Sequence, residues 1–342
     1  MKQLNIGIIG IGRFGRLHLQ VLQQLPGCKI VAIADTDEEL LKQVKKENSI
    51  ELLYTDAFDL IKNPAIDIVD IVSSEDTHGM FAIEAIKHGK HVFIEKPIAT
   101  TYKEAVEIEQ LAAEKNVQVM VGNISRFSTP YASIKKVIEN DKLGEIGMIR
   151  AKRNFSKNWF DHFGKRVHPV YESGIHDLDL ILWYVDSPCV EVYATERNVS
   201  GYTYPDLFST VLTFENRIVA SLDSAWLYPK GGPQNLVETL ELDGTIDADI
   251  EVYGMKGTAN FKLSHSGYSI WTEEEVLHPE LTLWTTEQGK IGGAIHAELS
   301  HFIEIVRMNR HSNIAPIRDS VEALRIADAI VQSAAEKRII SL

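Results

Sequence analysis

The chain has 342 residues, which is enough for about two domains of ordinary size. Hydrophobic residues make up 44% and charged residues 24% of it, as in a globular protein with a sizeable core, and this excludes a largely disordered chain. The formal charge of −13 disfavours a nucleic-acid partner, because a phosphate backbone would be repelled on average.

The two cysteines, Cys28 and Cys189, lie far apart and in no metal-ligand spacing, so the sequence predicts neither a disulfide framework nor a zinc site. The first residues run into a glycine-interrupted strand without a signal-peptide pattern, and no apolar run has the length of a membrane span. We therefore expect a cytoplasmic protein without a membrane partner.

Short β-branched runs alternate with amphipathic helical stretches up to residue 122, a pattern typical of βαβ units and a parallel sheet. The predicted strands are 5–9, 29–34, 67–73, 91–94 and 118–121. The predicted helices are 13–25, 37–47, 77–88 and 101–115. Residues 1–122 are thus predicted to form a doubly wound dinucleotide-binding domain.

The pattern changes after residue 122. Helices are predicted at 130–140 and 172–185, followed by consecutive strands without intervening helices at 190–197, 207–214, 217–225, 236–242, 246–253 and 257–263. Two further helices, 293–308 and 320–335, close the chain on either side of Pro316. Residues 123–342 are predicted to form an α+β domain with a mainly antiparallel open sheet, for substrate binding and oligomerisation.

A glycine-rich turn joins the first strand to the first helix, where backbone N–H groups can approach a pyrophosphate. It is made of Gly10, Ile11, Gly12, Arg13, Phe14 and Gly15. Asp35 ends the second strand 20 residues after Gly15, where a carboxylate accepts hydrogen bonds from ribose hydroxyls and repels a 2′-phosphate. The cofactor is predicted to be NAD rather than NADP. In the alternative interpretation, Asp35 only caps the next helix, although Thr36 and Asp37 could do so instead.

Glu95, Lys96 and Pro97 follow a predicted parallel strand at its carboxyl end, where ligands of doubly wound sheets bind. A lysine is most often a surface residue, but Pro97 holds the residue before it extended, so that Lys96 is aimed rather than mobile.

These residues resemble the Gfo/Idh/MocA family of oxidoreductases, whose members act on sugars and polyols. The resemblance covers nearly the whole chain. The motifs that carry it are GIGRFG followed by His18, GKHVFIEKPIA, Val121-Gly122 with Arg126-Phe127, the turn 144–147, Gly174-Ile175-His176-Asp177 and the closing 333–335.

The resemblance implies that Lys96 acts beside His176, with Glu172 four residues earlier. This spacing places a carboxylate and an imidazole on one face of a helix. Oxidation of a secondary alcohol needs a base for the hydroxyl proton, and His176 is suited to that near neutral pH. Lys96 would stabilise the alkoxide-like oxygen or relay its proton, and Glu172 would orient the imidazole or share a proton with it.

Further site residues follow from the same resemblance. Ser73, His78 and Glu95 are expected to line the cofactor pocket, and Arg126 and Trp159 the substrate side, although an aromatic such as Trp159 is more often core. Three positions depart from the family pattern: Glu172 replaces the usual aspartate, Ser74 and Glu75 alter the loop before His78, and Asn123 stands where phenylalanine is frequent.

The leading hypothesis is an NAD-dependent dehydrogenase that oxidises a secondary hydroxyl of an inositol or a cyclic sugar, as a homodimer or homotetramer. A basic cluster formed by Lys152, Arg153, Lys157, Lys165 and Arg166 leaves open a sugar-phosphate or nucleotide-sugar dehydrogenase. A non-catalytic NAD-binding sensor or regulator is the other alternative. His168, Glu172, His176 and Asp179 are possible metal ligands, but no metal is expected, because no cysteine supports such a site and the family does not need one.

Overall fold

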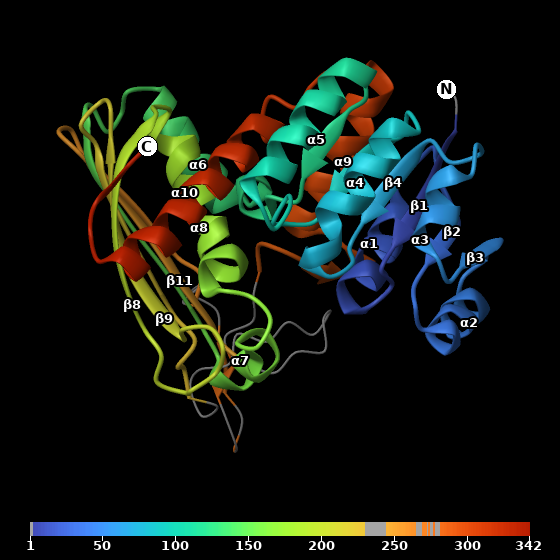
Figure 1. The fold of residues 1–342 in the computed structure, drawn as a ribbon, viewed down its shortest axis with the longest axis horizontal. Helices are drawn as coiled ribbons and strands as arrows, with labels where there is room; N and C mark the ends of the chain where they lie inside the picture. Colours follow the sequence, from blue (N-terminus) through green and yellow to red (C-terminus); the bar gives the residue numbers. More distant parts are fainter. Residues whose placement is uncertain (1–2, 230–243, 265–268, 272, 274–275, 278–280) are drawn as a thin grey trace. The chain divides into compact units, whose positions relative to one another are not determined.

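The computed structural model describes residues 3–229, 244–264, 269–271, 273, 276–277 and 281–342. The chain forms two compact units (Figure 1). Unit 1 comprises Met1–Ile124 and Trp284–Val321, and unit 2 comprises Ser125–Leu283 and Glu322–Leu342.

Unit 1 is built on a six-stranded parallel sheet in the order β3-β2-β1-β4-β5-β6, which confirms the doubly wound fold. Its strands are β1 (Leu4–Ile9), β2 (Cys28–Ala34), β3 (Leu52–Tyr54), β4 (Ile68–Ile71), β5 (His91–Ile94) and β6 (Val119–Val121). The order reverses between β1 and β4, so the carboxyl ends of these two strands form the switch point where ligands of such sheets bind.

The helices of unit 1 are α1 (Arg13–Gln24), α2 (Glu38–Glu47), α3 (Ala57–Lys62), α4 (His78–Lys87), α5 (Tyr102–Lys115) and α9 (Gly293–Met308). A 3₁₀ turn, η1 (Glu75–Thr77), precedes α4, and a second, η2 (Ile124–Phe127), begins at the last residue of the first segment of unit 1 and continues into unit 2. A hairpin of β15 (Thr286–Glu287) and β16 (Lys290–Ile291) precedes α9. Both α9 and β16 pack on α1. The sequence did not predict β3 or α3, because three and six residues are too few for a clear periodicity.

Unit 2 is built on a seven-stranded sheet in the order β12-β11-β7-β10-β9-β8-β17. The strands are β7 (Ile146–Phe155), β8 (Cys189–Arg197), β9 (Leu207–Phe214), β10 (Val219–Ala225), β11 (Ile246–Gly254), β12 (Thr258–Lys262) and β17 (Ile340–Ser341). Strands β7 and β10 are parallel and the other pairs antiparallel, which confirms a mainly antiparallel sheet. A small hairpin joins β13 (Ile270–Trp271) to β14 (Val276–Leu277).

Strand β7 lies in the middle of this sheet and was not predicted. Its sequence, IGMIRAKRNF, has an arginine on each face, Arg150 exposed and Arg153 buried, so the alternation of apolar and polar residues is broken. The predicted strand at 236–242 lies outside the described residues.

The helices of unit 2 are α6 (Thr129–Glu139), α7 (Lys157–Phe163) and α8 (Ile175–Val185), and α10 (Ile317–Glu336) continues into unit 2 from the end of unit 1. A π-helical turn, η3 (Val170–Gly174), runs directly into α8. The single helix predicted at 172–185 is therefore wrong in its first turn. Such π-helical turns occur frequently at functional sites.

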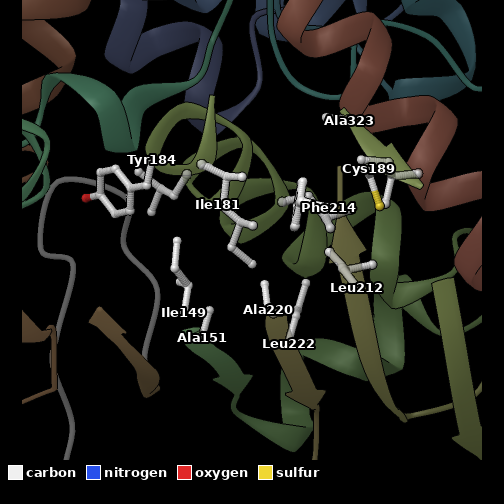
Figure 2. Close-up of a cluster of buried hydrophobic side chains, with 14 of the residues drawn as sticks. Ile149, Ala151, Ile181, Tyr184, Cys189, Leu212, Phe214, Ala220, Leu222 and Ala323 are labelled. Atoms are coloured by element: carbon white, nitrogen blue, oxygen red, sulfur yellow. The ribbon is translucent and has the colours of Figure 1, made fainter. Parts of the chain in front are cut away.

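The core of unit 2 lies between the sheet and its helices. Side chains of β7, β9 and β10 face those of α8 in one apolar cluster (Figure 2). Fully burying one large aliphatic side chain contributes about 1.5 to 3 kcal/mol, so this cluster is a main source of the stability of unit 2. The residues labelled in the figure are Ile149, Ala151, Ile181, Tyr184, Cys189, Leu212, Phe214, Ala220, Leu222 and Ala323.

Cys28 and Cys189 are both free thiols, and burial raises the pKa of Cys189 to about 12. Among the described residues, no helix is long and apolar enough to cross a membrane.

Candidate active site

Two glycines of the turn after β1 are required by the fold itself. Gly10 has a φ of +85°, and a Cβ there would lie 2.7 Å from the backbone of Ser73. A Cβ on Gly15 would lie 2.0 Å from the carbonyl oxygen of Gly10. Both positions therefore exclude any side chain, whether or not a ligand is bound.

Gly12 differs from them. It is the N-cap of α1, with a φ of −63° that any residue adopts, and a Cβ there would meet no atom within 4 Å. No contact with a described residue requires glycine at this position, but a pyrophosphate approaching the helix N-terminus would need that space. The turn therefore fits a dinucleotide. Arg13 is exposed beside it, and Phe14 is half-buried, 6.0 Å from the Trp284 ring by their centroids.

Asp35 lies at the end of β2 and is half-buried. Its Oδ2 accepts a hydrogen bond from the backbone N–H of Ile11 at 2.8 Å, and its Oδ1 accepts one from the backbone N–H of Asp37 at 3.0 Å. The cap of α2 is Asp37, which accepts from the backbone of Glu39 and Leu40. Asp35 is therefore not the helix cap, and its carboxylate keeps acceptor sites for ribose hydroxyls.

His78 joins the loop after β4 to the segment after β5. Its Nδ1 lies 2.7 Å from the carbonyl oxygen of Pro97 and its Nε2 lies 3.0 Å from that of Ser73. The Ser73 hydroxyl is 2.7 Å from that of Thr77. Both predicted residues, Ser73 and His78, therefore lie at the carboxyl end of β4, and the imidazole ties that end to the segment that carries Lys96.

Lys96 follows β5, and its peptide bond to Pro97 is cis. Among residues 92–99, all of which the structure describes, Lys96 alone is partly exposed. Its backbone N–H donates to Glu95 Oε2 at 3.1 Å, while the Glu95 side chain is buried. The fold thus keeps the Lys96 side chain at the surface of unit 1.

From the sequence, His18 is expected to be structural, and Asp70 is not predicted to have a role. His18 is fully buried and lies against Asp70 and Glu95. The available signal was an aspartate inside an otherwise apolar parallel strand, Ile68-Val69-Asp70-Ile71.

Glu172 and His176 lie in unit 2, on η3 and α8. Across residues 169–181, which are all described, the partly exposed residues are Tyr171, Glu172 and His176, and the rest are buried. The structure therefore keeps the two predicted catalytic side chains of this unit accessible. Their contact with a substrate stays a prediction.

Two buried ion pairs fasten α8 just after His176. Arg153 Nε lies 2.8 Å from Asp177 Oδ2, and Arg126 Nε lies 2.7 Å from Asp179 Oδ2. A second nitrogen of each guanidinium bonds the other carboxylate oxygen. Arg126 is thus buried within unit 2, and its predicted substrate contact stays a prediction.

The π-helical turn is held by hydroxyl groups. Ser173 Oγ donates to the carbonyl oxygen of Pro169 at 2.9 Å, lies 2.7 Å from Ser224 Oγ, and accepts from the Trp226 indole at 3.1 Å. A Cβ on Gly174 would lie 2.7 Å from the Phe208 ring, which explains the glycine. The turn that carries Glu172 is therefore rigidly supported.

Trp159 is half-buried, and its ring centroid is 5.6 Å from that of Phe155. A Cβ on Gly244 would lie 2.6 Å from its ring. These contacts show packing within unit 2, while a substrate role for Trp159 stays a prediction.

The side-chain amide of Asn123 has a partner within the protein, because its Nδ2 donates to Ser320 Oγ at 2.9 Å within unit 1. Of the possible metal ligands, His168 lies 3.0 Å from Glu196 and Asp179 bonds Arg126. No group of three or more His, Cys, Asp or Glu that could hold a metal occurs among the described residues.

The basic cluster of the sequence is divided by the fold. Lys152 and Arg153 are neighbours on β7, so their side chains lie on opposite faces of the sheet. Lys152 bonds Asp247 at 2.8 Å, and Arg153 is paired with Asp177. Lys157 is exposed on α7, and Lys165 and Arg166 are exposed after it.

Comparison with known proteins agrees with this architecture. The chain is 28% identical over 341 residues to the uncharacterized oxidoreductase YrbE of Bacillus subtilis, covering 98% of this chain and 95% of the relative. It is 25% identical over 332 residues to a scyllo-inositol 2-dehydrogenase (NAD(+)) of Bacillus subtilis, covering 94% and 90%. The solved structure of a myo-inositol 2-dehydrogenase from Lactobacillus plantarum matches with a TM-score of 0.85 at 23% identity, covering 100% of both chains.

Residues 4–123 match the oxidoreductase family model for the NAD-binding Rossmann fold, and residues 135–342 match that family's C-terminal alpha/beta domain. These matches confirm two predictions, that the cofactor is NAD and that the protein is an oxidoreductase. The chain belongs to the Gfo/Idh/MocA family of NAD-dependent oxidoreductases.

Proposed function

We propose that this protein is a dehydrogenase that oxidises a secondary hydroxyl of an inositol or a cyclic sugar with NAD. The observation that carries the proposal is the exposure of Lys96, Glu172 and His176, which together with Tyr171 are the partly exposed residues of two otherwise buried stretches, 92–99 and 169–181. A titratable side chain kept accessible in a buried stretch is what proton transfer to a substrate requires. The name of the scyllo-inositol relative supports a polyol as the substrate class.

When bound, NAD would supply the acceptor for the hydride that leaves the carbinol carbon of the substrate. Gly12 and the N-terminus of α1 would hold its pyrophosphate, and Asp35 its ribose hydroxyls. Ser73 and His78 would line its pocket at the carboxyl end of β4.

The chain's own residues would manage the hydroxyl proton. His176 takes the proton as the base, and Glu172 orients the imidazole. The Lys96 ammonium stabilises the negative charge that develops on the oxygen as the proton leaves. The products are a ketone, the reduced cofactor and one proton.

A substrate screen tests this function. Free inositols and cyclic sugars are each incubated with NAD and the absorbance of NADH is followed, with sugar phosphates and nucleotide sugars as the comparison set. We expect turnover with at least one free polyol or sugar. Turnover confined to phosphorylated compounds would favour the sugar-phosphate alternative, and NAD binding without any turnover would favour a sensor.

A pair of variants tests the mechanism. His176→Ala and Lys96→Ala should each lower kcat by roughly 10² to 10⁴, and the double variant should be scarcely worse than either, because both groups act on one hydroxyl. His162→Ala, at an exposed histidine of α7, is the matched control and should be unchanged. Near-normal turnover in His176→Ala, or fully multiplicative losses in the double variant, would contradict the mechanism.

We also propose that the protein is a homodimer or homotetramer that uses the outer face of the unit 2 sheet. Tyr193 and Val211 pair across β8 and β9 on that face and are 47% and 44% exposed, so they form an apolar pair that a second subunit could cover. Sedimentation velocity should show more than one subunit in the wild type and a shift toward the monomer in Tyr193→Lys. A monomeric wild type would refute the proposal.

A further inference from the structure

His18, on α1, is buried between two carboxylates. Its Nδ1 lies 3.0 and 3.2 Å from the two oxygens of Asp70, and its Nε2 lies 3.3 Å from Glu95 Oε1. The His18 side chain is fully buried, and its ring packs against Phe14 and Phe93 at centroid distances of 5.4 and 5.5 Å. Buried charges occur where they are paired, so this geometry favours a cation between the two carboxyl groups.

The protonated imidazole is that cation. Burial by itself lowers the pKa of His18, but Asp70 and Glu95 outweigh burial and raise it to about 10. Both ring nitrogens then carry a hydrogen, and each faces a different carboxylate.

Glu95 links this group to the neighbour of the predicted catalytic lysine. Its Oε1 faces His18, while its Oε2 accepts from the backbone N–H of Lys96 at 3.1 Å. The carboxylate also fills the space beside Gly122, where a Cβ would lie 2.5 Å from Oε1. The place of the carboxylate is therefore set by α1, β4 and the end of β6.

We propose that His18, Asp70 and Glu95 form a buried charged triad that fixes the backbone at Lys96, so that His18 and Asp70 are positioning residues for the reaction. The inference rests on the proposed function, because the triad would affect the reaction only by positioning Lys96. None of the three needs to touch the substrate. An ammonium misplaced by about 1 Å can cost a reaction a factor of the order of 10².

Two variants disturb the triad in different ways. His18→Gln removes the charge and keeps a hydrogen-bonding side chain, whereas Gly122→Ala keeps every charge and displaces the Glu95 carboxylate. We expect each to lower kcat by roughly 10- to 100-fold. The affinity for NAD, measured by calorimetry, should fall much less than kcat, because the glycine-rich turn and Asp35 stay in place even where Glu95, which is predicted to line the cofactor pocket, is displaced.

The controls are His88→Gln and Gly147→Ala. His88 is an exposed histidine at the end of α4, and a Cβ on Gly147 would meet no atom within 4 Å. Both controls should keep the wild-type kcat. If the triad had only a structural role, His18→Gln and Gly122→Ala would lower thermal stability but would not lower kcat more than they lower the affinity for NAD.

A double variant tests the route through Lys96. If the triad acts through that residue, His18→Gln should add no further loss to Lys96→Ala. Multiplicative losses, or an unchanged kcat in both His18→Gln and Gly122→Ala, would overturn the proposal. Should His18→Gln fail to fold, Gly122→Ala and Asp70→Asn decide the outcome by the same criteria.

An independent readout separates failure of the triad from failure of the proposed function. Lysines are reductively methylated with ¹³C, and the NMR signal of Lys96 is assigned with Lys96→Arg. We expect this signal to shift in His18→Gln and Gly122→Ala but not in His88→Gln. An unmoved signal would refute the triad even if the enzyme is active, and a moved signal would support it even if no polyol is oxidised.

Discussion

At the scale of single residues, Gly12 differs from Gly10 and Gly15, because the packing of the protein leaves room for a side chain at Gly12 and not at the other two. We expect Gly12→Val to abolish NAD binding, because the branched side chain would occupy the space for the pyrophosphate, while its Cβ would meet no atom of the described residues within 4 Å. Gly147→Val, at another open glycine, on β7, should bind NAD normally. Calorimetry on variants shown to be folded by circular dichroism checks this. Undiminished affinity in Gly12→Val would mean that the turn has only a structural role.

Asp35 is the residue that we predict to decide between NAD and NADP. Asp35→Ala should weaken NAD far more than NADP, because hydrogen bonds from ribose hydroxyls to a charged group contribute about 1.5 to 3 kcal/mol each. Asp37→Ala is the matched control, since it removes the cap of α2 at a cost of about 0.5 to 2 kcal/mol without touching cofactor preference. A wild type that binds NADP at least as tightly as NAD would contradict the assignment.

At the scale of elements, α8 depends on a buried ion pair with β7. Arg153→Met should lower the free energy of unfolding of unit 2 by about 3 to 5 kcal/mol, because it leaves Asp177 charged and buried without its partner. Arg150→Met is the control on the same strand. Its guanidinium is exposed and lies 3.8 Å from Glu251, a pair that contributes about 0 to 1 kcal/mol. Urea denaturation of both variants gives the comparison, and equal losses would show that burial of the pair does not decide its importance.

The same pair bears on the site, because His176 directly precedes Asp177. The π-helical turn before it and the ion pairs after it hold the histidine at a junction of two helical geometries. A rigid support of this kind is what a proton-transferring side chain needs.

At the scale of the whole molecule, His18 makes stability depend on pH. Its pKa is raised from the usual 6.5 to about 10 in the folded protein, so its stabilising contribution is complete below about pH 6.5 and is lost as the pH rises through about 10. The free energy of unfolding of the wild type should therefore fall with rising pH across this window more steeply than that of His18→Gln, which has no proton to release. Parallel curves from denaturant titrations would show that His18 is not charged in the folded state.

The local pattern of the sequence was enough to predict much of this molecule. Apolar runs alternating with amphipathic helices predicted the parallel sheet, and the strand at 91–94 and the helix at 293–308 agree with the structure residue for residue. The glycine-rich turn and Asp35 could be predicted because their chemistry depends on short spacings along the chain. Lys96 was singled out by its place before Pro97 at the carboxyl end of a predicted strand, whereas its pairing with His176 came from the family resemblance.

Only the tertiary structure decided the features that depend on residues far apart in sequence. The return of Trp284–Val321 to unit 1, the burial of Arg153 and Arg126 against α8, and the grouping of His18, Asp70 and Glu95 all follow from packing. Strand β7 escaped prediction because a buried arginine breaks the apolar pattern, and its aspartate partner is known only from the fold. A sequence records which side chains are charged, but whether a charge is solvated or paired in the core is set by the fold.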